Sequence, residues 1–266
     1  MTLKALIGTV TTAALVSLAT EADAVATFQL QIHAGTFDSG VILGTTGASG
    51  LVQSTVNNVN GGSGNRFDSS GLNVQGAYHY DQNGTLYMSL DVPDITHTVS
   101  TQGKIDFYLT VTGVTNPTGS MSIKYDLSGS NASTHSNVGF DNSSQGWLYY
   151  SATNSTTPET TPGAAVVTTP AIASNFVSTP QCHLANPGSL AYSCEYITPI
   201  TLNSNYSLTE KLELSYSADT RGKTARGQSS FQVPFVVPEP ATLALLGTGL
   251  LFAGASTRRR KAAPKA

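Results

Sequence analysis

The chain has 266 residues, of which 39% are hydrophobic and 11% are charged, and its formal net charge is -3. This apolar content is sufficient for a buried core, which excludes a chain that is disordered throughout. Residues 25–237 carry seven basic and thirteen acidic side chains, and the basic ones are scattered, so the positive surface that nucleic-acid binding requires is absent.

The N-terminus has the layout of a secretory signal peptide. Lys4 precedes an apolar run at residues 5–18, and the small residues Ala22 and Ala24 then occupy the two positions that a signal peptidase inspects. We therefore expect residues 1–24 to form a signal helix that is removed after Ala24. The alternative is a short N-terminal helix of the folded domain.

Apolar residues alternate with polar ones through most of residues 25–236, which predicts β-strands. The alternation is clearest at 28–32, 72–80, 86–92, 105–111, 121–127 and 206–216. Asn83-Gly84 predicts a hairpin between the second and third of these segments, and the turn-rich residues 113–120 predict that the next two also pair. We expect an all-β domain, an antiparallel β-sandwich of roughly nine to eleven strands.

The aromatic residues Trp147, Tyr149 and Tyr150 follow a polar Asn/Ser segment. The simpler interpretation makes Trp147 a core anchor at the start of a strand. The alternative is a glycan contact, because an aromatic ring offers an apolar face to the C–H side of a sugar.

Residues 151–163 are rich in Ser, Thr and Pro, and residues 57–64 are rich in Asn and Gly. Both segments predict surface loops, the first of them a plausible carrier of glycosylation. A division into two domains at 151–163 is disfavoured, because residues 164–237 alone would bury too little surface.

Cys182 and Cys194 are the only cysteines, and in an exported chain they predict a disulfide. A metal site would need more ligands, since only His183 is adjacent and the five histidines lack metal-binding spacing. There is no nucleophile elbow or reactive-thiol environment. We therefore expect no catalytic residues, no metal and no cofactor, although Ca²⁺ in the Asp-containing turns and a pair of carboxylates brought together by the fold stay open as alternatives.

The C-terminal segment, residues 237–261, has three parts in a fixed order. Pro238, Glu239 and Pro240 come first, an apolar run at 241–256 predicts a transmembrane helix, and the last part is the basic cluster Arg258, Arg259, Arg260 and Lys261. Positive flanks stay in the cytoplasm, so the body would face outward and residues 262–266 would end inside.

This arrangement resembles the PEP-CTERM sorting signal of Gram-negative bacteria that produce exopolysaccharide. The resemblance implies recognition of the segment by an exosortase, a membrane protease, and cleavage near Pro238-Glu239-Pro240. It implies nothing about the body. The alternative is a plain membrane anchor, which would keep the basic end in the mature protein.

Together these features predict an exported, non-catalytic protein of the cell surface or extracellular matrix, anchored in the inner membrane while in transit. Its expected partners are signal peptidase, an exosortase-like protease, the membrane and exopolysaccharide. A carbohydrate-binding module is the principal alternative. A secreted hydrolase is another, and so is an ice-binding protein, because a similar tail has been associated with ice-binding domains and short T-x-T pieces occur at 96–98 and 110–112.

Overall fold

The structure is a computed structural model that describes residues 27–45, 47, 49–55, 59–62, 65–68, 73–98, 102–131, 142–152, 163–173, 176–185, 191–216 and 224–234. In this part of the chain every regular element is a β-strand, which confirms the predicted all-β class. The predicted signal helix and transmembrane helix lie outside the described residues, as does most of the Ser/Thr-rich segment 151–163.

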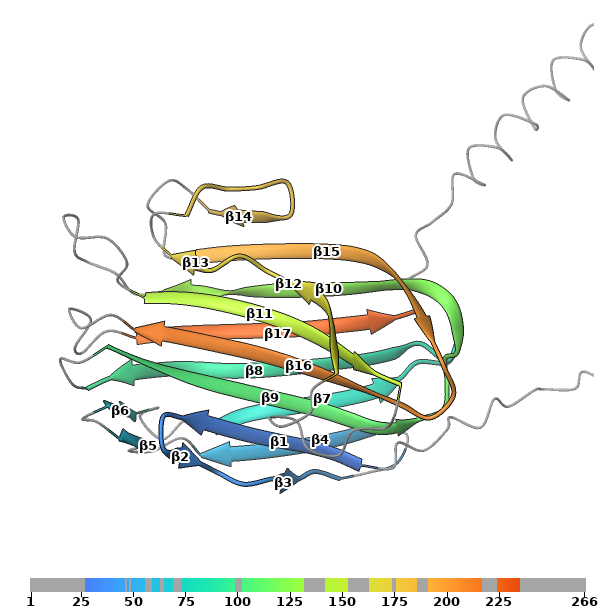
Figure 1. Ribbon diagram of the computed structural model, residues 1–266, viewed down its shortest axis with the longest axis horizontal. Helices are drawn as coiled ribbons and strands as arrows, with labels where there is room; N and C mark the ends of the chain where they lie inside the picture. Colours follow the sequence, from blue (N-terminus) through green and yellow to red (C-terminus); the bar gives the residue numbers. More distant parts are fainter. Residues whose placement is uncertain are drawn as a thin grey trace, which may run out of the picture.

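The strands form two antiparallel sheets, here called sheet A and sheet B (Figure 1). In sheet A the order is β12 (Ala164–Thr168), β11 (Asn142–Ser151), β16 (Tyr206–Tyr216), β9 (Gly103–Val114), β1 (Thr27–Ala34) and β2 (Phe37–Asp38). Two short strands extend it, β13 (Ile172–Ala173) beside β11 and β3 (Ile42–Leu43) beside β1.

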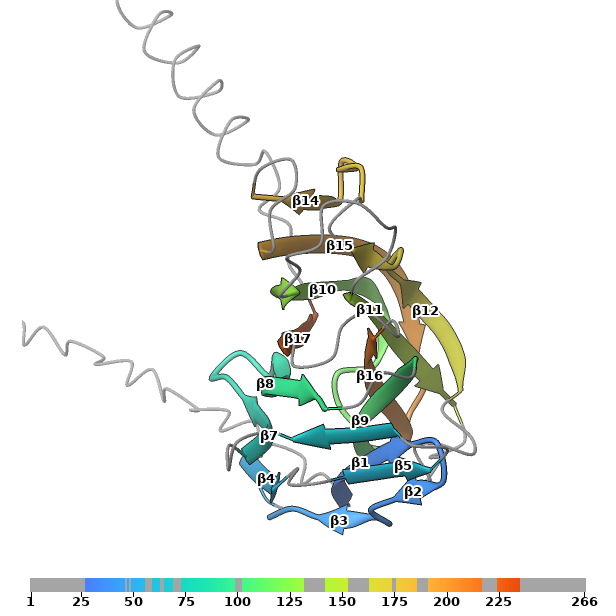
Figure 2. The same ribbon diagram turned by 90° about the vertical axis from the view of Figure 1, so that its left-hand side faces the viewer.

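Sheet B has the order β14 (Cys182–Leu184), β15 (Ala191–Leu202), β10 (Gly119–Asn131), β17 (Thr224–Val233), β8 (Leu86–His97), β6 (Asn65–Asp68) and β5 (Val59–Gly62). Beside β8 lies β7 (Asn73–Tyr80), and β4 (Ser49–Thr55) pairs with β7. Figure 2 shows the two layers from the side, with β8 and β17 in one layer and β16 and β12 in the other.

One apolar core lies between the two sheets. Glycines let the layers approach closely: a side chain at Gly76 of sheet B would collide with Leu109 of sheet A, and one at Gly146 of sheet A would collide with Tyr125 and Leu127 of sheet B. Each sheet thus has an inner face that packs on the other sheet and an outer face that points away from it.

The predicted strands are confirmed, and so is the predicted hairpin. Tyr80 pairs with Leu86, and the Asp81 carboxylate accepts hydrogen bonds from the backbone N–H groups of Asn83 and Thr85 in the turn, each at 2.8 Å. The described residues contain seventeen strands, more than the nine to eleven predicted, because seven of them are short pieces of two to five residues; the other ten have seven or more residues.

The prediction that segments 105–111 and 121–127 pair with each other is wrong. They lie in β9 and β10, which belong to different sheets. The physical reason is that β9 already has a hydrogen-bonded neighbour on each edge, β1 on one and β16 on the other. The chain therefore crosses between the layers at residues 115–118 instead of turning back on itself.

Candidate functional site

Four charged side chains meet on the outer face of sheet A and are called here the charged cluster: Lys104 and Asp106 of β9, and Lys211 and Glu213 of β16. Lys211 Nζ lies 3.2 Å from Asp106 Oδ1 and 3.3 Å from Glu213 Oε2. Lys104 Nζ lies 3.5 Å from Asp106 Oδ2 and 3.0 Å from Glu213 Oε2. Each lysine thus contacts both carboxyl groups.

Strand register brings the cluster together. Asp106 is directly opposite Glu213, and Lys211 is opposite Tyr108, two residues further along the same face. The pair between Lys211 and Asp106 is almost closed to solvent, with side-chain exposures of 11% and 5%. Lys104 is at the rim, with an exposure of 55%.

The two carboxyl groups have opposite pKa shifts. Burial raises the pKa of Asp106, and a hydrogen bond with Glu213 raises it further, against the opposing charge of Lys211. Burial also acts to raise the pKa of Glu213, but hydrogen bonds with Asp106 and Lys104 and the charges of both lysines hold that pKa well below its usual range. Asp106 is therefore the carboxyl that takes up a proton first, and Glu213 stays ionised.

Aromatic rings flank the buried lysine. Lys211 Nζ is 4.5 Å from the centre of the Trp147 ring and 5.5 Å from that of Tyr108, within the range of cation–π attraction. Trp147 is half-buried on the outer face of sheet A and does not lie in the core between the layers. The ring thus packs on a charged side chain of its own sheet.

The three aromatic residues proposed as glycan contacts do not form one surface. Tyr149 shares the outer face with Trp147, whereas Tyr150 points to the inner face. There its ring lies 5.8 Å from that of Tyr206, and its hydroxyl accepts a hydrogen bond from the backbone N–H of Asn203 at 3.1 Å. The pleat of β11 separates them, because adjacent residues of a strand point to opposite faces.

A hollow of about 300 Å³ adjoins the charged cluster, with His33, Lys104 and Asp106 in its wall. Within the residues that the structure describes, no group of three or more His, Cys, Asp or Glu side chains is arranged to hold a metal ion. The hollow therefore offers one carboxyl group, one exposed ammonium group and an imidazole.

A second hollow, of about 280 Å³, lies on the outer face of sheet B. The rings of His79 and Tyr87 stack at one side, 4.7 Å apart and nearly parallel at 4°. Ser89, Ser230 and Asp126 supply polar groups to its lining. This site was not predicted from the sequence. The signal that could have found it is the hairpin at Asn83-Gly84, because pairing its strands places His79 opposite Tyr87, on the face away from Tyr78 and Met88.

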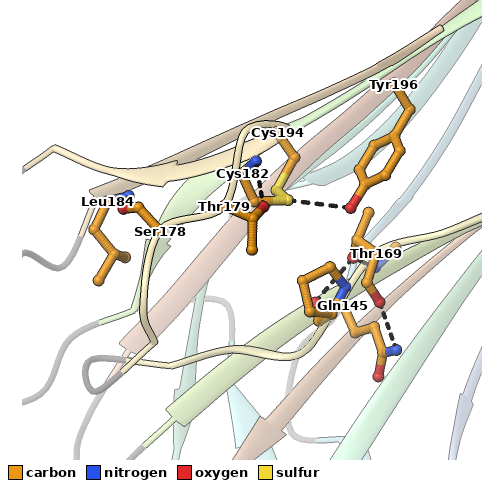
Figure 3. Close-up of a disulfide and its surroundings, with 10 residues drawn as sticks. Gln145, Thr169, Ser178, Thr179, Cys182, Leu184, Cys194 and Tyr196 are labelled. Carbon is orange, nitrogen blue, oxygen red and sulfur yellow. Dashed lines mark hydrogen bonds between the residues drawn. A yellow bond between two sulfur atoms is a disulfide. The ribbon is translucent and has the colours of Figure 1, made fainter.

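The predicted disulfide between Cys182 and Cys194 is confirmed (Figure 3). The two cysteines are directly opposite each other in β14 and β15, so the bond ties the edge strand to sheet B. Thr179 Oγ1 accepts a hydrogen bond from the Cys182 backbone N–H at 3.0 Å, and the Tyr196 hydroxyl lies 3.5 Å from Cys182 Sγ.

The remaining predicted sites are outside the described residues. They are the signal-cleavage residues Ala22 and Ala24, the sorting residues Pro238, Glu239 and Pro240, and the basic residues Arg258, Arg259, Arg260 and Lys261. Where the structure does describe the chain, it contains no helix with the length and apolar character needed to cross a membrane.

Comparison with known families identifies the end of the chain. Residues 236–261 match the family described as the PEP-CTERM protein-sorting motif. This segment is a PEP-CTERM motif. The match includes Pro238-Glu239-Pro240 and the basic cluster, and it confirms the resemblance seen in the sequence. A PEP-CTERM motif implies export, passage through the membrane and processing by an exosortase. The match does not extend to the β-sheet body.

The similarity of the whole chain to known proteins and structures is weaker. No curated protein matches the chain. A chain in the structure of infectious bursal disease virus, Gx strain, is 13% identical with a TM-score of 0.22, over 80% of this chain and 57% of that one. For the Gt strain the identity is 13% and the TM-score 0.17, over 82% and 66%. The protein thus spans less than two thirds of these viral chains, and TM-scores this low carry no argument.

Proposed function

We propose that this protein is a non-catalytic structural or interaction component of the bacterial cell surface or extracellular matrix. The PEP-CTERM motif at residues 236–261 carries the proposal, because a sorting motif of this kind implies that the attached body is exported. The body suits that destination: a disulfide closes the edge of sheet B, and oxidising compartments allow such bonds to persist. In this proposal the β-sandwich is the mature protein.

The arrangement of the carboxyl groups supports a non-catalytic role. A glycosidase needs two carboxyl groups about 5 Å or more apart, with space between them for a sugar or a water molecule. Asp106 and Glu213 instead contact the same two ammonium groups, those of Lys104 and Lys211, at 3.0 to 3.5 Å. Carboxyl groups that are paired with two lysines are poorly placed to act as the acid and the nucleophile of a glycosidase.

Ice binding has less support. That function needs a flat, exposed array of threonine side chains. Thr110 and Thr112 are buried, and their hydroxyl groups are hydrogen-bonded to those of Thr209 and Thr27 at 2.8 and 2.7 Å. This T-x-T piece therefore holds strands together and does not face bulk solvent.

The mass of the mature protein tests the sorting step. We expect the form isolated from the cell surface to lack the basic cluster at 258–261, because an exosortase would cut near Pro238-Glu239-Pro240. Intact-mass spectrometry of the surface form, compared with the form from a strain that lacks the exosortase, makes the measurement. A surface form that still ends at Ala266 would show that the segment is a plain anchor.

Carbohydrate binding is the second candidate, and the hollow on sheet B favours it. The His79–Tyr87 stack gives an apolar ring surface beside Asp126 and Ser230, which can bond sugar hydroxyl groups. The Trp147 face is a poorer platform, because Lys211 already lies over the ring.

Two variants test whether the glycan binds at the hollow on sheet B or at the Trp147 face of sheet A. We expect Tyr87→Ala to weaken binding to exopolysaccharide by about tenfold or more, as the loss of an aromatic contact worth about 1.4 kcal/mol would. Trp147→Ala, on the other sheet, is the matched control and should leave binding unchanged. Titration of both variants by calorimetry makes the comparison, and equal affinities for Tyr87→Ala and the unmodified protein would remove the sheet B hollow as the glycan site.

A further inference from the structure

We propose that Lys211 and Asp106 condense to form an intramolecular amide cross-link between β16 and β9, with Glu213 as the proton-transfer group. The proposal goes beyond the surface role given above and does not depend on it. It rests on three features of the charged cluster: an amine next to a carboxyl group, a second carboxyl group in contact with that amine, and the burial of the amine and of the first carboxyl group.

The reacting groups are already in contact. Lys211 Nζ lies 3.2 Å from Asp106 Oδ1, so no movement of either strand is needed to bring the amine to the carboxyl carbon. Trp147 and Tyr108 hold the lysine from both sides, at 4.5 and 5.5 Å from ring centre to Nζ. Holding two groups in this way replaces a bimolecular encounter with an intramolecular step, which is a large advantage.

Burial distinguishes Lys211 from Lys104, the other amine near Asp106. The Lys104 side chain is 55% exposed, so its ammonium group keeps much of its hydration. The Lys211 side chain is 11% exposed, and that of Asp106 is 5% exposed. A buried ammonium–carboxylate pair is costly, because both charges are desolvated, and transfer of one proton converts it into a neutral amine and a carboxylic acid.

The reaction balances without any added reagent. In the neutral form of the pair, the nitrogen lone pair of Lys211 attacks Cγ of the protonated Asp106. Glu213 Oε2, 3.3 Å from Lys211 Nζ, accepts the proton that the nitrogen loses as the new bond forms. The bond between Nζ and Cγ forms, the bond from Cγ to the hydroxyl oxygen breaks, and Glu213 returns the proton to that oxygen. One water molecule leaves, and no atom is oxidised or reduced.

The site also suits the product. An amide is neutral, so the desolvated charges of Lys211 and Asp106 disappear together. The new N–H group is next to Glu213 Oε2, which can accept its hydrogen bond. Lys104 Nζ lies 3.5 Å from Asp106 Oδ2 before the reaction and can donate a hydrogen bond to the amide oxygen. Both polar groups of the cross-link therefore have partners.

Peptide mapping of the mature surface protein tests the proposal. The protein is reduced, alkylated and digested with trypsin, which does not cut after an acylated lysine. We expect the peptide of residues 105–124 to be joined to the peptide of residues 125–221, because trypsin cannot cut after the linked Lys211. The mass of the joined product should be lower by one water molecule than the sum of the masses of the two peptides. Separate peptides that end at Lys124 and at Lys211 would overturn the proposal.

Three variants assign the roles. Lys211→Arg keeps the positive charge and the ring contacts but cannot form this amide, so the joined peptide should disappear. Lys104→Arg should retain it. After refolding, Glu213→Gln should form the joined peptide far more slowly than the unmodified chain. A link to Lys104 in the unmodified protein would overturn the assignment of the amine, and an unchanged rate in Glu213→Gln would overturn the role of Glu213.

Discussion

Glu210 is an ionisable side chain in the middle of the apolar core. It lies on the inner face of β16, between Leu208 and Leu212, and is completely buried. Within the part of the chain that the structure describes, neither carboxyl oxygen makes a hydrogen bond of standard geometry. Burial therefore raises the pKa of this carboxyl well above its ordinary value, and the nearby Ser229 hydroxyl only partly opposes the shift.

This residue should make the stability of the protein depend on pH. The unfolded chain ionises Glu210 above a pKa of about 4.3, whereas the folded chain keeps it protonated to higher pH. Between these two pKa values the unfolded state binds fewer protons, so the free energy of unfolding falls as pH rises, by about 1.4 kcal/mol per pH unit. We expect Glu210→Gln to remove this contribution, and urea unfolding at a series of pH values measures it.

An exposed glutamate on the other sheet provides the control. The Glu195 side chain is 56% exposed and pairs with Lys124 at 2.9 Å, so Glu195→Gln is the same substitution outside the core and serves for comparison. If Glu210→Gln and the unmodified protein lose stability equally steeply with rising pH, Glu210 is ionised in the folded state and the core accommodates its charge.

At the scale of elements, the distance between the layers depends on glycines. Gly146 of β11 faces Tyr125 and Leu127 of β10 in the opposite sheet. We expect Gly146→Ala to destabilise the protein by about 1–3 kcal/mol, because the added methyl group collides with the Tyr125 hydroxyl in a filled core. The urea midpoint should fall while the slope of the transition stays unchanged.

A double variant of Gly146 and Tyr125 tests whether the contact between these two residues causes the loss of stability. Tyr125→Phe removes the hydroxyl group that collides with the new methyl group, so Gly146→Ala should cost less in a Tyr125→Phe background. Equal costs in both backgrounds would attribute the loss to the backbone of β11 instead of the contact between layers.

The strands also differ in how far the sequence predicts them. The β7–β8 hairpin was predictable because its turn residues and both apolar faces lie within about twenty residues of chain. The partners of β9 were not, because β1 and β16 are far from it in sequence, and each could offer the same alternating pattern to several neighbours. The face of each side chain follows from alternation, while the choice of neighbour follows from which edges stay free.

At the scale of the whole molecule, the chain combines a sorting motif with a body of two β-sheets. The motif at 236–261 carries most of the positive charge of the C-terminal region, whereas the body is acidic and has few charges. Several of those few lie in the charged cluster, where two strands separated by about a hundred residues meet. A covalent link there would close residues 106–211, about half of the body, into a loop, in addition to the short loop closed by the disulfide.

The sequence by itself determined the all-β class, the strands with strong alternation, the disulfide and the sorting motif. Each of these depends on residues that are close together in the chain or, for the two cysteines, on there being only one way to pair them. Only the tertiary structure placed β9 beside β16, and with it Lys211 beside Asp106 and Glu213. The reason is that local patterns decide which face a side chain occupies, whereas competition among strand edges decides which residues from distant segments share that face.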